Sequence, residues 1–337
     1  MKDMNSIFQD DLLQWYEENK RDLAFRKKKD AYQIWISEIM AQQTRIEAML
    51  PYFERFIKVL PTMKDLAQVD DQKLNKLWQG LGYYSRARNL KKCAIECMNK
   101  YNGSLPRSKK ELMELPGIGS YTAGAIASIA YDENVSAIDG NVNRLFSRLY
   151  RIDEDLRKAK GKKEIEKRVD ASLPGSENIS AYNQALMELG ALICLPKNPK
   201  CKLCPISSYC QAYLYADPSQ YPVLSKVKKR KIVHKEIFVL IYKDKIRLHR
   251  REEKGLLYGL YGFDEKEVKN YLTKKELEPY THIFSHVEWH MKAWLVFVDW
   301  SDSHFYTMEE IKKEIPIPSA FLPFLRQVEK IIENYKL

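Results

Sequence analysis

Four of the six cysteines fall in one short segment with the spacing C-x6-C-x2-C-x5-C, namely Cys194, Cys201, Cys204 and Cys210. Thiolates this close together, in a segment that also carries several prolines, can surround one metal centre. Four-cysteine sites hold zinc as readily as an iron–sulfur cluster, so the residue types alone leave both open. The other two, Cys93 and Cys97, are expected to be buried apolar residues of a helix.

Two carboxyl groups stand in contrasting surroundings. Glu38 lies among the apolar residues Trp35, Ile36, Ile39 and Met40. Such surroundings raise the pKa of a carboxyl group and can keep it protonated near neutrality. Asp139 stands in a Gly-Asn turn just before an expected helix, where N–H donors favour the ionised form. Each has a plainer alternative: a polar position of an amphipathic helix for Glu38, and a helix N-cap for Asp139.

A tight turn precedes Asp139 by about twenty residues. Pro116, Gly117 and Gly119 form it, and a helix of small residues is expected from about Ser120. A helix N-terminus flanked by glycines can approach a phosphate closely and bind it without reading base sequence. An ordinary connection between helices is the alternative.

The elements that must position these residues change character along the chain. From Ile7 to about Tyr213, apolar residues recur at three- and four-residue spacing, which predicts consecutive helices. From Glu236 onward the period becomes two, in segments rich in β-branched and aromatic residues, which predicts strands. We therefore expect an all-α domain over 1–215, a basic linker over 216–231 and an α+β domain over 232–337.

Composition limits the partners. The sequence has 56 Lys and Arg against 45 Asp and Glu, a net charge of +11, which favours a polyanion such as nucleic acid. The N-terminal segment lacks the pattern of a signal peptide, and no apolar run approaches membrane-spanning length. We expect a cytoplasmic, nucleoid-associated protein that is monomeric and does not bind membranes.

Together the segments resemble the MutY family of the helix-hairpin-helix glycosylase superfamily. A hairpin followed by an aspartate is typical of the superfamily, and the cysteine run is similar to the cluster loop of endonuclease III and MutY glycosylases. Three further segments agree with MutY: Ile36–Thr44, Gly80–Leu90 and Tyr182–Cys194. The sequence departs from the family pattern at Ala24 and Phe25, where Pro-Trp is usual, and at Ala41, which replaces a leucine.

The resemblance implies a two-domain fold with a specific cofactor. The helical domain 1–215 would be the endonuclease III-like catalytic domain, with the helix-hairpin-helix at about 107–130 and a [4Fe-4S] cluster loop at 194–210. The domain 232–337 would be Nudix-like but without the phosphohydrolase box, so no nucleotide hydrolysis is expected. A monovalent or divalent cation at the hairpin is also compatible with the resemblance.

The resemblance also implies the reaction, which is removal of adenine from double-stranded DNA when adenine lies opposite 8-oxoguanine or guanine. Glu38 would be the general acid, and Asp139 would stabilise the oxocarbenium ion or a covalent intermediate. Related lyases carry a catalytic lysine where this sequence has Tyr121, and a phenol cannot form an imine. The sequence therefore resembles a monofunctional glycosylase, in which Tyr121 and Asn141 complete the sugar side of the site.

Binding residues follow from the same resemblance. Arg26 and Glu188 would hold the extruded adenine, and Gly117 and Gly119 would contact a DNA phosphate. The intercalating and opposite-base contacts would be made by Gln43, Thr44 and Tyr83. The residues that read 8-oxoguanine would be Phe284, Ser285 and His286. Of the neighbouring pair Tyr83 and Tyr84, one is expected to be core. The alternation of His282, His286 and His290 also suggests one shared strand face, with solvent-facing histidines favoured over a metal site.

Two other functions remain to be distinguished. One is an endonuclease III-like glycosylase/lyase that acts on oxidised pyrimidines, against which Tyr121 and the second domain argue. The other is a basic DNA-binding protein with a redox-sensing cluster, which would leave the pairing of Glu38 with Asp139 unexplained.

Overall fold

The computed structural model describes residues 4–26, 28–226 and 229–335. The chain divides into two compact units. The first comprises Met1–Phe53, Ile57–Ala67 and Asn89–Lys226, and the second comprises Glu54–Phe56, Gln68–Arg88 and Val227–Leu337. Residues 227 and 228 of the predicted linker lie outside the described residues, and the predicted domain boundaries stay a prediction.

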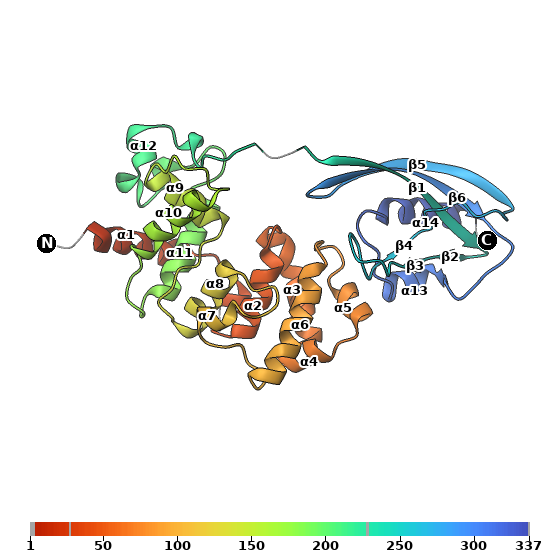
Figure 1. Ribbon diagram of the computed structural model, residues 1–337, viewed down its shortest axis with the longest axis horizontal. Coiled ribbons are helices and arrows are strands. Elements are labelled where there is room, and N and C mark those ends of the chain that lie inside the picture. Colours follow the sequence, from red (N-terminus) through yellow and green to blue (C-terminus); the bar gives the residue numbers. More distant parts are fainter. Residues whose placement is uncertain (1–3, 27, 227–228, 336–337) are drawn as a thin grey trace. The chain divides into compact units, whose positions relative to one another are not determined.

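Helices make up the regular structure of the described residues before 226 (Figure 1), as the helical pattern predicts. The α-helices are α1 (Met4–Asn19), α2 (Ala31–Ala41), α3 (Ile46–Val59), α4 (Met63–Gln68), α5 (Asp71–Leu77), α6 (Ser85–Lys100), α7 (Lys109–Leu112), α8 (Ser120–Tyr131), α9 (Gly140–Leu149), α10 (Ala159–Asp170), α11 (Ile179–Leu192) and α12 (Gln211–Tyr215). Short 3-10 helices are η1 (Ala24–Arg26), η2 (Cys201–Leu203), η3 (Ser207–Tyr209) and η4 (Pro218–Gln220).

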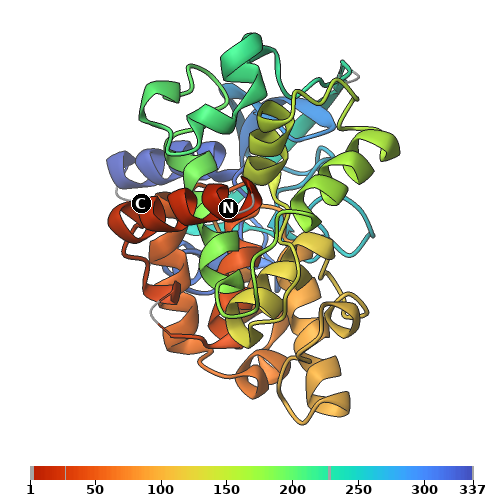
Figure 2. The ribbon, with the colours of Figure 1, turned by 90° about the vertical axis from the view of Figure 1, so that its left-hand side faces the viewer.

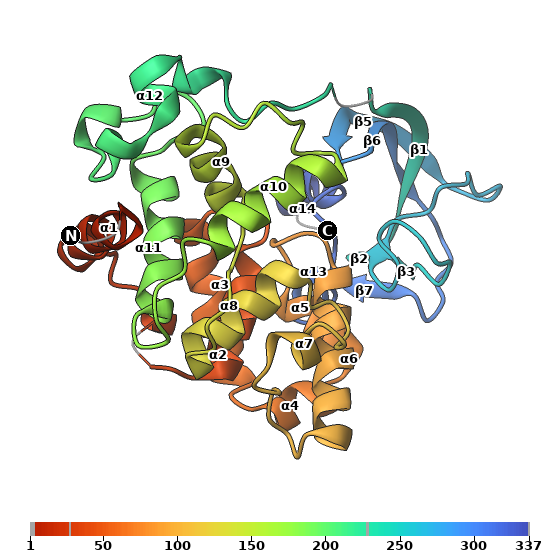
Figure 3. The same cartoon turned by 60° about the vertical axis from the view of Figure 1, so that its left-hand side comes forward.

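Helix α11 is central to the first unit. It packs against α1, α8 and α9, and α8 also packs against α2. Figure 2 shows α1 crossing beside α11, and Figure 3 shows α8, α9 and α11 as neighbours. Residues 182–190 of α11 are all buried, so the helix is covered on every face. Side chains from α2, α8, α9 and α11 can therefore meet in one place.

Local sequence sets where α2 begins and how closely α8 packs. Asp30 caps α2 by accepting hydrogen bonds from the backbone N–H groups of Tyr32 and Gln33. Helix α8 consists largely of small residues, and Gly124 lies directly against the backbone after α8. A Cβ atom on Gly124 would stand 2.1 Å from the Ser136 carbonyl oxygen. The absence of a side chain at Gly124 is thus a packing requirement.

The second unit contains a five-stranded sheet in the order β5-β6-β1-β2-β7. Its strands are β1 (Lys231–Tyr242), β2 (Lys245–Arg247), β5 (Thr273–Ile283), β6 (Val287–Phe297) and β7 (Phe305–Thr307). Strands β1 and β6 run parallel and the other pairs antiparallel. A separate pair, β3 (His249–Arg250) with β4 (Tyr261–Gly262), completes the strands. This arrangement confirms the predicted α+β class for the C-terminal region.

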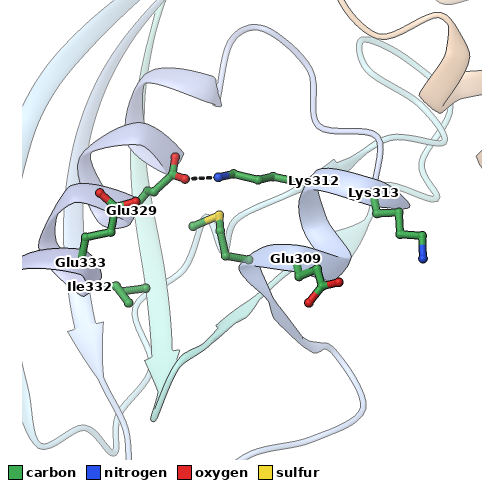
Figure 4. A pocket seen from close by; sticks show the side chains of 7 residues that line it. Glu309, Lys312, Lys313, Glu329, Ile332 and Glu333 are labelled. Carbon is green, nitrogen blue, oxygen red and sulfur yellow. Dashed lines mark hydrogen bonds and ion pairs between the residues drawn. The ribbon is translucent and has the colours of Figure 1, made fainter. Parts of the chain in front are cut away.

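Both faces of the sheet are apolar over part of their length. The larger core lies between the sheet and helices α13 (Met308–Lys313) and α14 (Leu322–Tyr335), and a smaller one surrounds Phe238 on the other face. Figure 4 shows the ion pair between Lys312 of α13 and Glu329 of α14, beside a shallow groove between these two helices. The pair is exposed, so it contributes little to stability.

The predicted strands are present with different bounds. The strand expected from Glu236 begins at Lys231, and the one expected from Ala293 begins at Val287. The predicted strand face shared by His282, His286 and His290 is wrong. A turn over 284–286 separates β5 from β6, and in the β5–β6 register Thr281 pairs with His290 while His282 pairs with Trp289. Because neighbouring residues of a strand face opposite sides, His282 and His290 lie on opposite faces of the sheet.

We expect Gly124→Ala to lower the free energy of unfolding by about 1–3 kcal/mol, because the new methyl group must displace the backbone at Ser136. The change should be destabilising although alanine favours a helix over glycine by roughly 1 kcal/mol. Urea unfolding followed by circular dichroism measures it. Gly140→Ala is the control, because a Cβ atom there would meet nothing within 4 Å. Equal stability of the two variants would contradict the packing argument.

Candidate active site

A cavity of about 950 Å³ opens within the first unit. Four stretches of chain and one residue of α8 line it. The lining residues include Arg21, Phe25, Arg26, Glu38, Ala41, Gln43, Thr44, Tyr121, Asp139, Asn141, Met187 and Glu188. Sequence-distant residues that were predicted to act together therefore do lie in one place. Two of the three residues that depart from the family pattern, Phe25 and Ala41, also line this cavity.

Glu38 is buried in the wall of the cavity. It lies in α2, where every residue from Ile34 to Met40 is buried, and its own exposed fraction is 8%. Burial raises the pKa of Glu38, while the hydrogen bond from Tyr121 and the charge of Arg26 oppose the rise. The net shift is upward, as predicted from the apolar neighbours. This carboxyl group therefore holds a proton at higher pH than an exposed glutamate.

Tyr121 contacts Glu38 directly. Its hydroxyl donates a hydrogen bond to Oε2 of Glu38 and lies 3.4 Å from Sδ of Met187. Burial, followed by the charges of Glu38 and Asp139, raises the pKa of Tyr121 well above its usual value. The phenol therefore stays protonated and acts as a donor. Met187, which the sequence did not single out, fixes the other side of the phenol.

Asp139 caps α9, which was the plainer alternative from sequence, and it also lines the cavity. Oδ1 accepts from the backbone N–H of Val142 at 2.7 Å, and Oδ2 accepts from Nδ2 of Asn141 at 2.7 Å. Burial raises the pKa of Asp139, and these two hydrogen bonds oppose the rise. The N-cap is therefore also the carboxylate that faces the cavity.

Two arginines bind a buried glutamate that also lines the cavity. Arg21 donates from Nε to Oε2 of Glu188 at 2.8 Å and from Nη2 to Oε1 at 3.0 Å, and Nη1 of Arg26 also donates to Oε1. Glu188 is fully buried. Burial works against its charged form, but the two guanidinium groups outweigh it and lower the pKa of Glu188. Arg21 was missed from sequence although it lies in the segment that departs from the family pattern.

The turn after α2 brings Gln43 and Thr44 to the rim of the cavity. Gln43 has a positive φ of 58°, which is uncommon for a residue other than glycine. Its side chain is exposed, and that of Thr44 is half-buried. Both positions are thus open to a ligand that approaches the cavity.

The predicted tyrosine pair separates into one exposed and one buried ring. Tyr83 has an exposed fraction of 46%, and Tyr84 is buried. Tyr83 has a φ of 47° next to Gly82 at 69°, so it stands at the apex of a sharp turn. The guanidinium of Arg86 lies over the Tyr83 ring at 5.7 Å and over the Trp78 ring at 5.3 Å. This stack holds the turn.

The predicted hairpin consists of α7, the turn that follows it, and α8. Gly117 has a φ of 78°, and a Cβ atom on it would lie 2.6 Å from Cβ of Asn89. Gly119 is the N-cap of α8 and forms no side-chain capping bond, and a Cβ atom there would meet nothing within 4 Å. The N-terminus of α8 is therefore uncapped by a side chain and open to an approaching group.

The four clustered cysteines line one apolar cavity: Cys194, Cys201, Cys204 and Cys210. Burial raises the pKa of Cys204 to about 12 when no metal is bound. Among the described residues, no three His, Cys, Asp or Glu side chains converge on a point where one metal ion could bind. Cys93 and Cys97 are fully buried in α6, as predicted.

Two arginines of α9 fix the cysteine loop. Arg148 is fully buried, and its Nη1 donates to Sγ of Cys194 at 3.3 Å and to the Leu195 carbonyl at 2.7 Å. Arg144 donates from Nε to the Cys194 carbonyl at 2.8 Å and from Nη2 to Oδ1 of Asn141 at 2.9 Å. Asn141 bonds Asp139 in turn, so hydrogen bonds connect the cysteine loop to the cavity. Neither arginine was identified from sequence.

The remaining predicted residues lie in the second unit, at the 284–286 turn between β5 and β6. Ser285 and His286 are exposed, and Ser285 Oγ is 3.3 Å from Nδ1 of His286. Phe284 instead packs against the core, with its ring 5.0 Å from that of Trp289 and 4.5 Å from that of His282. The turn thus offers two polar side chains outward and is anchored by one aromatic ring.

No helix in the described residues combines the length and apolar character needed to cross a membrane.

Comparison with known families matches both parts of this chain. Residues 36–173 match the HhH-GPD superfamily of base excision DNA repair proteins, and residues 236–327 match the Nudix domain. The first part also resembles a non-covalent endonuclease III–DNA complex, with a TM-score of 0.53 and 25% identity over 63% of this chain and 96% of that one. The fold and the site thus define a helix-hairpin-helix DNA glycosylase with an added Nudix-like domain.

Two bacterial relatives extend the match along the chain. The adenine DNA glycosylase of Buchnera aphidicola subsp. Schizaphis graminum is 33% identical over 98% of this chain and 99% of its own. That of Buchnera aphidicola subsp. Baizongia pistaciae is 37% identical over 77% of this chain and 74% of its own. The chain belongs to the adenine DNA glycosylase family of MutY type, which is a family of base-excision-repair enzymes.

We expect Tyr121→Phe to raise the pKa of Glu38 further, because the lost hydroxyl donates to the ionised carboxylate and so favours the charged form. Carboxyl-carbon NMR of protein labelled at glutamate Cδ measures the shift. Tyr131→Phe is the matched control, since Tyr131 lies in the same helix and donates to the Leu105 carbonyl instead. An unchanged or lowered Glu38 pKa in Tyr121→Phe would contradict the assigned contact.

Proposed function

We propose that the chain hydrolyses the N-glycosidic bond of adenine opposite 8-oxoguanine or guanine in double-stranded DNA, without cutting the strand. One observation carries the proposal. A buried carboxyl group with a raised pKa, Glu38, shares a cavity with a second carboxyl group, Asp139, that accepts two hydrogen bonds. Loss of a base from deoxyribose resembles glycoside hydrolysis, which uses two such groups in different environments.

Glu38 is the general acid in this proposal. Adenine is a poor leaving group, so protonation at N7 allows the C1′–N9 bond to break with its electron pair leaving on the base. Asp139 lies on the side of the sugar, where its negative charge stabilises the oxocarbenium ion or traps it covalently. Water then adds at C1′ and gives up a proton to the carboxylate that Glu38 has become.

Tyr121 and Asn141 complete the sugar side. Tyr121 holds Glu38 by its hydrogen bond, and Asn141 holds Asp139 by another. The position that carries an attacking lysine in related lyases is a phenol here, and a phenol forms no Schiff base. The enzyme is therefore monofunctional, and the product is an abasic site in an uncut strand.

Arg21, Arg26 and Glu188 form the pocket for the extruded adenine. Both oxygens of Glu188 already accept hydrogen bonds from the arginines, so Glu188 holds the guanidinium groups in place. The arginines retain other N–H groups that can donate to ring nitrogens of the base. Base extrusion leaves a gap in the helix stack, and we assign Gln43, Thr44 and the exposed Tyr83 to the contacts there.

Two further features of the chain support DNA binding. Gly117 and Gly119 leave the N-terminus of α8 open, so a phosphate can approach its N–H groups. A monovalent or divalent cation at this hairpin belongs to the same proposal. The net charge of +11 favours the polyanion throughout.

The cysteine loop holds a [4Fe-4S] cluster in this proposal. Cys194, Cys201, Cys204 and Cys210 line one cavity, and their soft thiolates suit iron–sulfur ligation. Arg148, buried against Cys194, supplies a positive charge next to the thiolates. When bound, the cluster cross-links the loop and takes no part in the hydrolysis. Hydrogen bonds of Arg144 and Asn141 connect this loop to Asp139, so an ordered loop helps to position Asp139.

The turn Phe284–His286, hereafter the reader loop, recognises 8-oxoguanine. This base differs from guanine by an oxygen at C8 and a proton at N7, so a few hydrogen bonds to that edge distinguish them. Ser285 and His286 are exposed and polar, as such contacts require. Each contact contributes roughly 1–3 kcal/mol of discrimination.

A single assay tests the reaction. We expect the protein to release adenine from duplexes with A opposite 8-oxoguanine and, more slowly, opposite guanine, and to leave a thymine glycol duplex intact. Strands should break only after alkali treatment. Glu38→Gln should still bind the mismatched duplex, with excision slowed by about 10²–10⁴-fold because the proton donor is lost.

Two outcomes of this assay would overturn parts of the proposal. Strand cleavage without alkali, together with action on thymine glycol, would indicate a glycosylase/lyase. Excision by Glu38→Gln at near wild-type rate would remove Glu38 from the role of acid.

Metal analysis tests the cofactor. We expect purified protein to be yellow-brown with about four irons per chain, because four thiolates line one cavity. Cys204→Ser should lose the colour, whereas Cys93→Ala should keep it, since Cys93 is buried in α6 away from this loop. Stoichiometric zinc in place of iron would refute the assignment.

A further inference from the structure

We propose that Lys235 and Trp289 are positioning residues that hold the reader loop in its recognition geometry. The inference rests on the proposed role of that loop. Neither residue was identified from sequence, and both are largely buried. Trp289 has an exposed fraction of 5%, and the Lys235 side chain is 17% exposed.

Trp289 is the surface on which the reader loop rests. Its ring lies 5.0 Å from that of Phe284 at an interplanar angle of 69°, an edge-to-face contact. On its far side, Trp289 packs against Phe321 at 6.2 Å. Trp289 is thus the link between the first residue of the loop and the main core of the unit.

Strand register explains why Lys235 reaches this ring. Trp289 pairs with Val233 of β1 and with His282 of β5. Lys235 is two residues beyond Val233, so it faces the same side of the sheet as a diagonal neighbour of Trp289. Its Nζ lies 4.5 Å from the centre of the Trp289 ring, within the range of a cation–π contact.

The ammonium group of Lys235 is held in place by an acidic partner. Its ammonium forms an ion pair with Glu265, and Glu265 also accepts from Nη1 of Arg251 at 2.7 Å. A lysine that is mostly buried needs such a partner, since an unpaired buried charge is costly. The result is a chain of contacts from Arg251 through Glu265 and Lys235 to Trp289 and then to the loop.

The backbone of the reader loop is fixed separately. The N–H of Phe284 donates to the Val287 carbonyl at 2.9 Å, and the N–H of Lys231 donates to the His286 carbonyl at 3.4 Å. Nε of Arg230 donates to the Phe284 carbonyl at 3.1 Å. These bonds set the course of the turn but leave the Phe284 side chain to be placed by its ring contacts with Trp289 and His282.

Placement of Phe284 matters because discrimination between 8-oxoguanine and guanine depends on very few hydrogen bonds. Such contacts require their donors and acceptors to be held within about 0.5 Å of the productive position. Ser285 and His286 flex with the loop if its aromatic anchor tilts. A looser anchor should therefore reduce selectivity before it reduces chemistry.

A second lysine–tryptophan pair in the same sheet, Lys274 of β5 with Trp294 of β6, serves as a matched control. Nζ of Lys274 lies 4.6 Å from the Trp294 ring and 2.6 Å from Oε1 of Glu267, and its side chain is 23% exposed. Trp294 is five residues beyond Trp289, so it faces the other side of the sheet. This pair has the same chemistry but no contact with Phe284.

The experiment compares Lys235→Met with Lys274→Met in full-length protein. Methionine keeps most of the side-chain volume and removes the charge. We measure adenine excision and duplex affinity with A opposite 8-oxoguanine and with A opposite guanine, together with thermal unfolding. We expect Lys235→Met to lower the preference for 8-oxoguanine by about three- to tenfold, as loss of one cation–π contact can.

The loss should appear in affinity for the 8-oxoguanine duplex, with excision at saturating enzyme nearly unchanged. Lys235→Arg should restore the preference, because a guanidinium also stacks on an aromatic face. Lys274→Met should keep it. Equal preference in both methionine variants, or equal loss in both, would overturn the positioning role, since a purely structural effect would move the two alike.

Ser285→Ala with His286→Ala separates this inference from the function on which it rests. If that double variant loses the preference for 8-oxoguanine and Lys235→Met does not, only the positioning role fails. If the double variant keeps full preference, the reader loop itself is wrongly assigned.

Discussion

Burial of the Glu38 carboxyl group is the constraint on which the catalytic unit depends. An ionisable group inside a helix that is buried on every face must either lose its charge or find a donor, and Glu38 does both in part. Its donor is Tyr121 on α8, and the close packing of α8 is possible because Gly124 lets the helix lie against the backbone at Ser136. The surroundings of the Glu38 carboxyl group therefore depend on where α8 lies.

The two carboxyl groups of the cavity differ in how they are held as well as in exposure, since Glu38 is buried and Asp139 is half-buried. Burial raises the pKa of both, but Glu38 has one neutral donor whereas Asp139 has a backbone N–H at the start of α9 and the Asn141 amide. A helix N-terminus favours the anion. The proposed mechanism has Glu38 give a proton while Asp139 stays charged, and the N–H donors to Asp139 act in that direction because they lower its pKa against the effect of burial.

The sequence was sufficient for features that depend on local pattern. The start of α8, the cap at Asp139, the buried Cys93 and Cys97 and the apolar setting of Glu38 all follow from neighbouring residues. Contacts between distant segments could not be predicted from local pattern, because they are set by packing. Examples are the contacts of Arg21 with Glu188, Arg144 with Asn141 and Lys235 with Trp289. The histidine alternation failed because a turn without Gly, Pro or Asn interrupts it, and residue period alone does not reveal such a turn.

The proposed function assigns selectivity and chemistry to different parts of the chain, and the side chains of these two parts are held in different ways. In the cavity Glu38, Asp139 and Glu188 are held by hydrogen bonds between partly buried polar groups, which define position because an unmade bond there is costly. In the proposed function Ser285 and His286 of the reader loop must be able to meet a base, and both side chains are exposed, with one 3.3 Å contact between them. The loop is instead ordered by the packing of the Phe284 ring against Trp289 and by hydrogen bonds that Arg230 and Lys231 donate to its backbone carbonyls. Aromatic packing is suited to this task, because it orders a turn without occupying the polar groups that read the partner base.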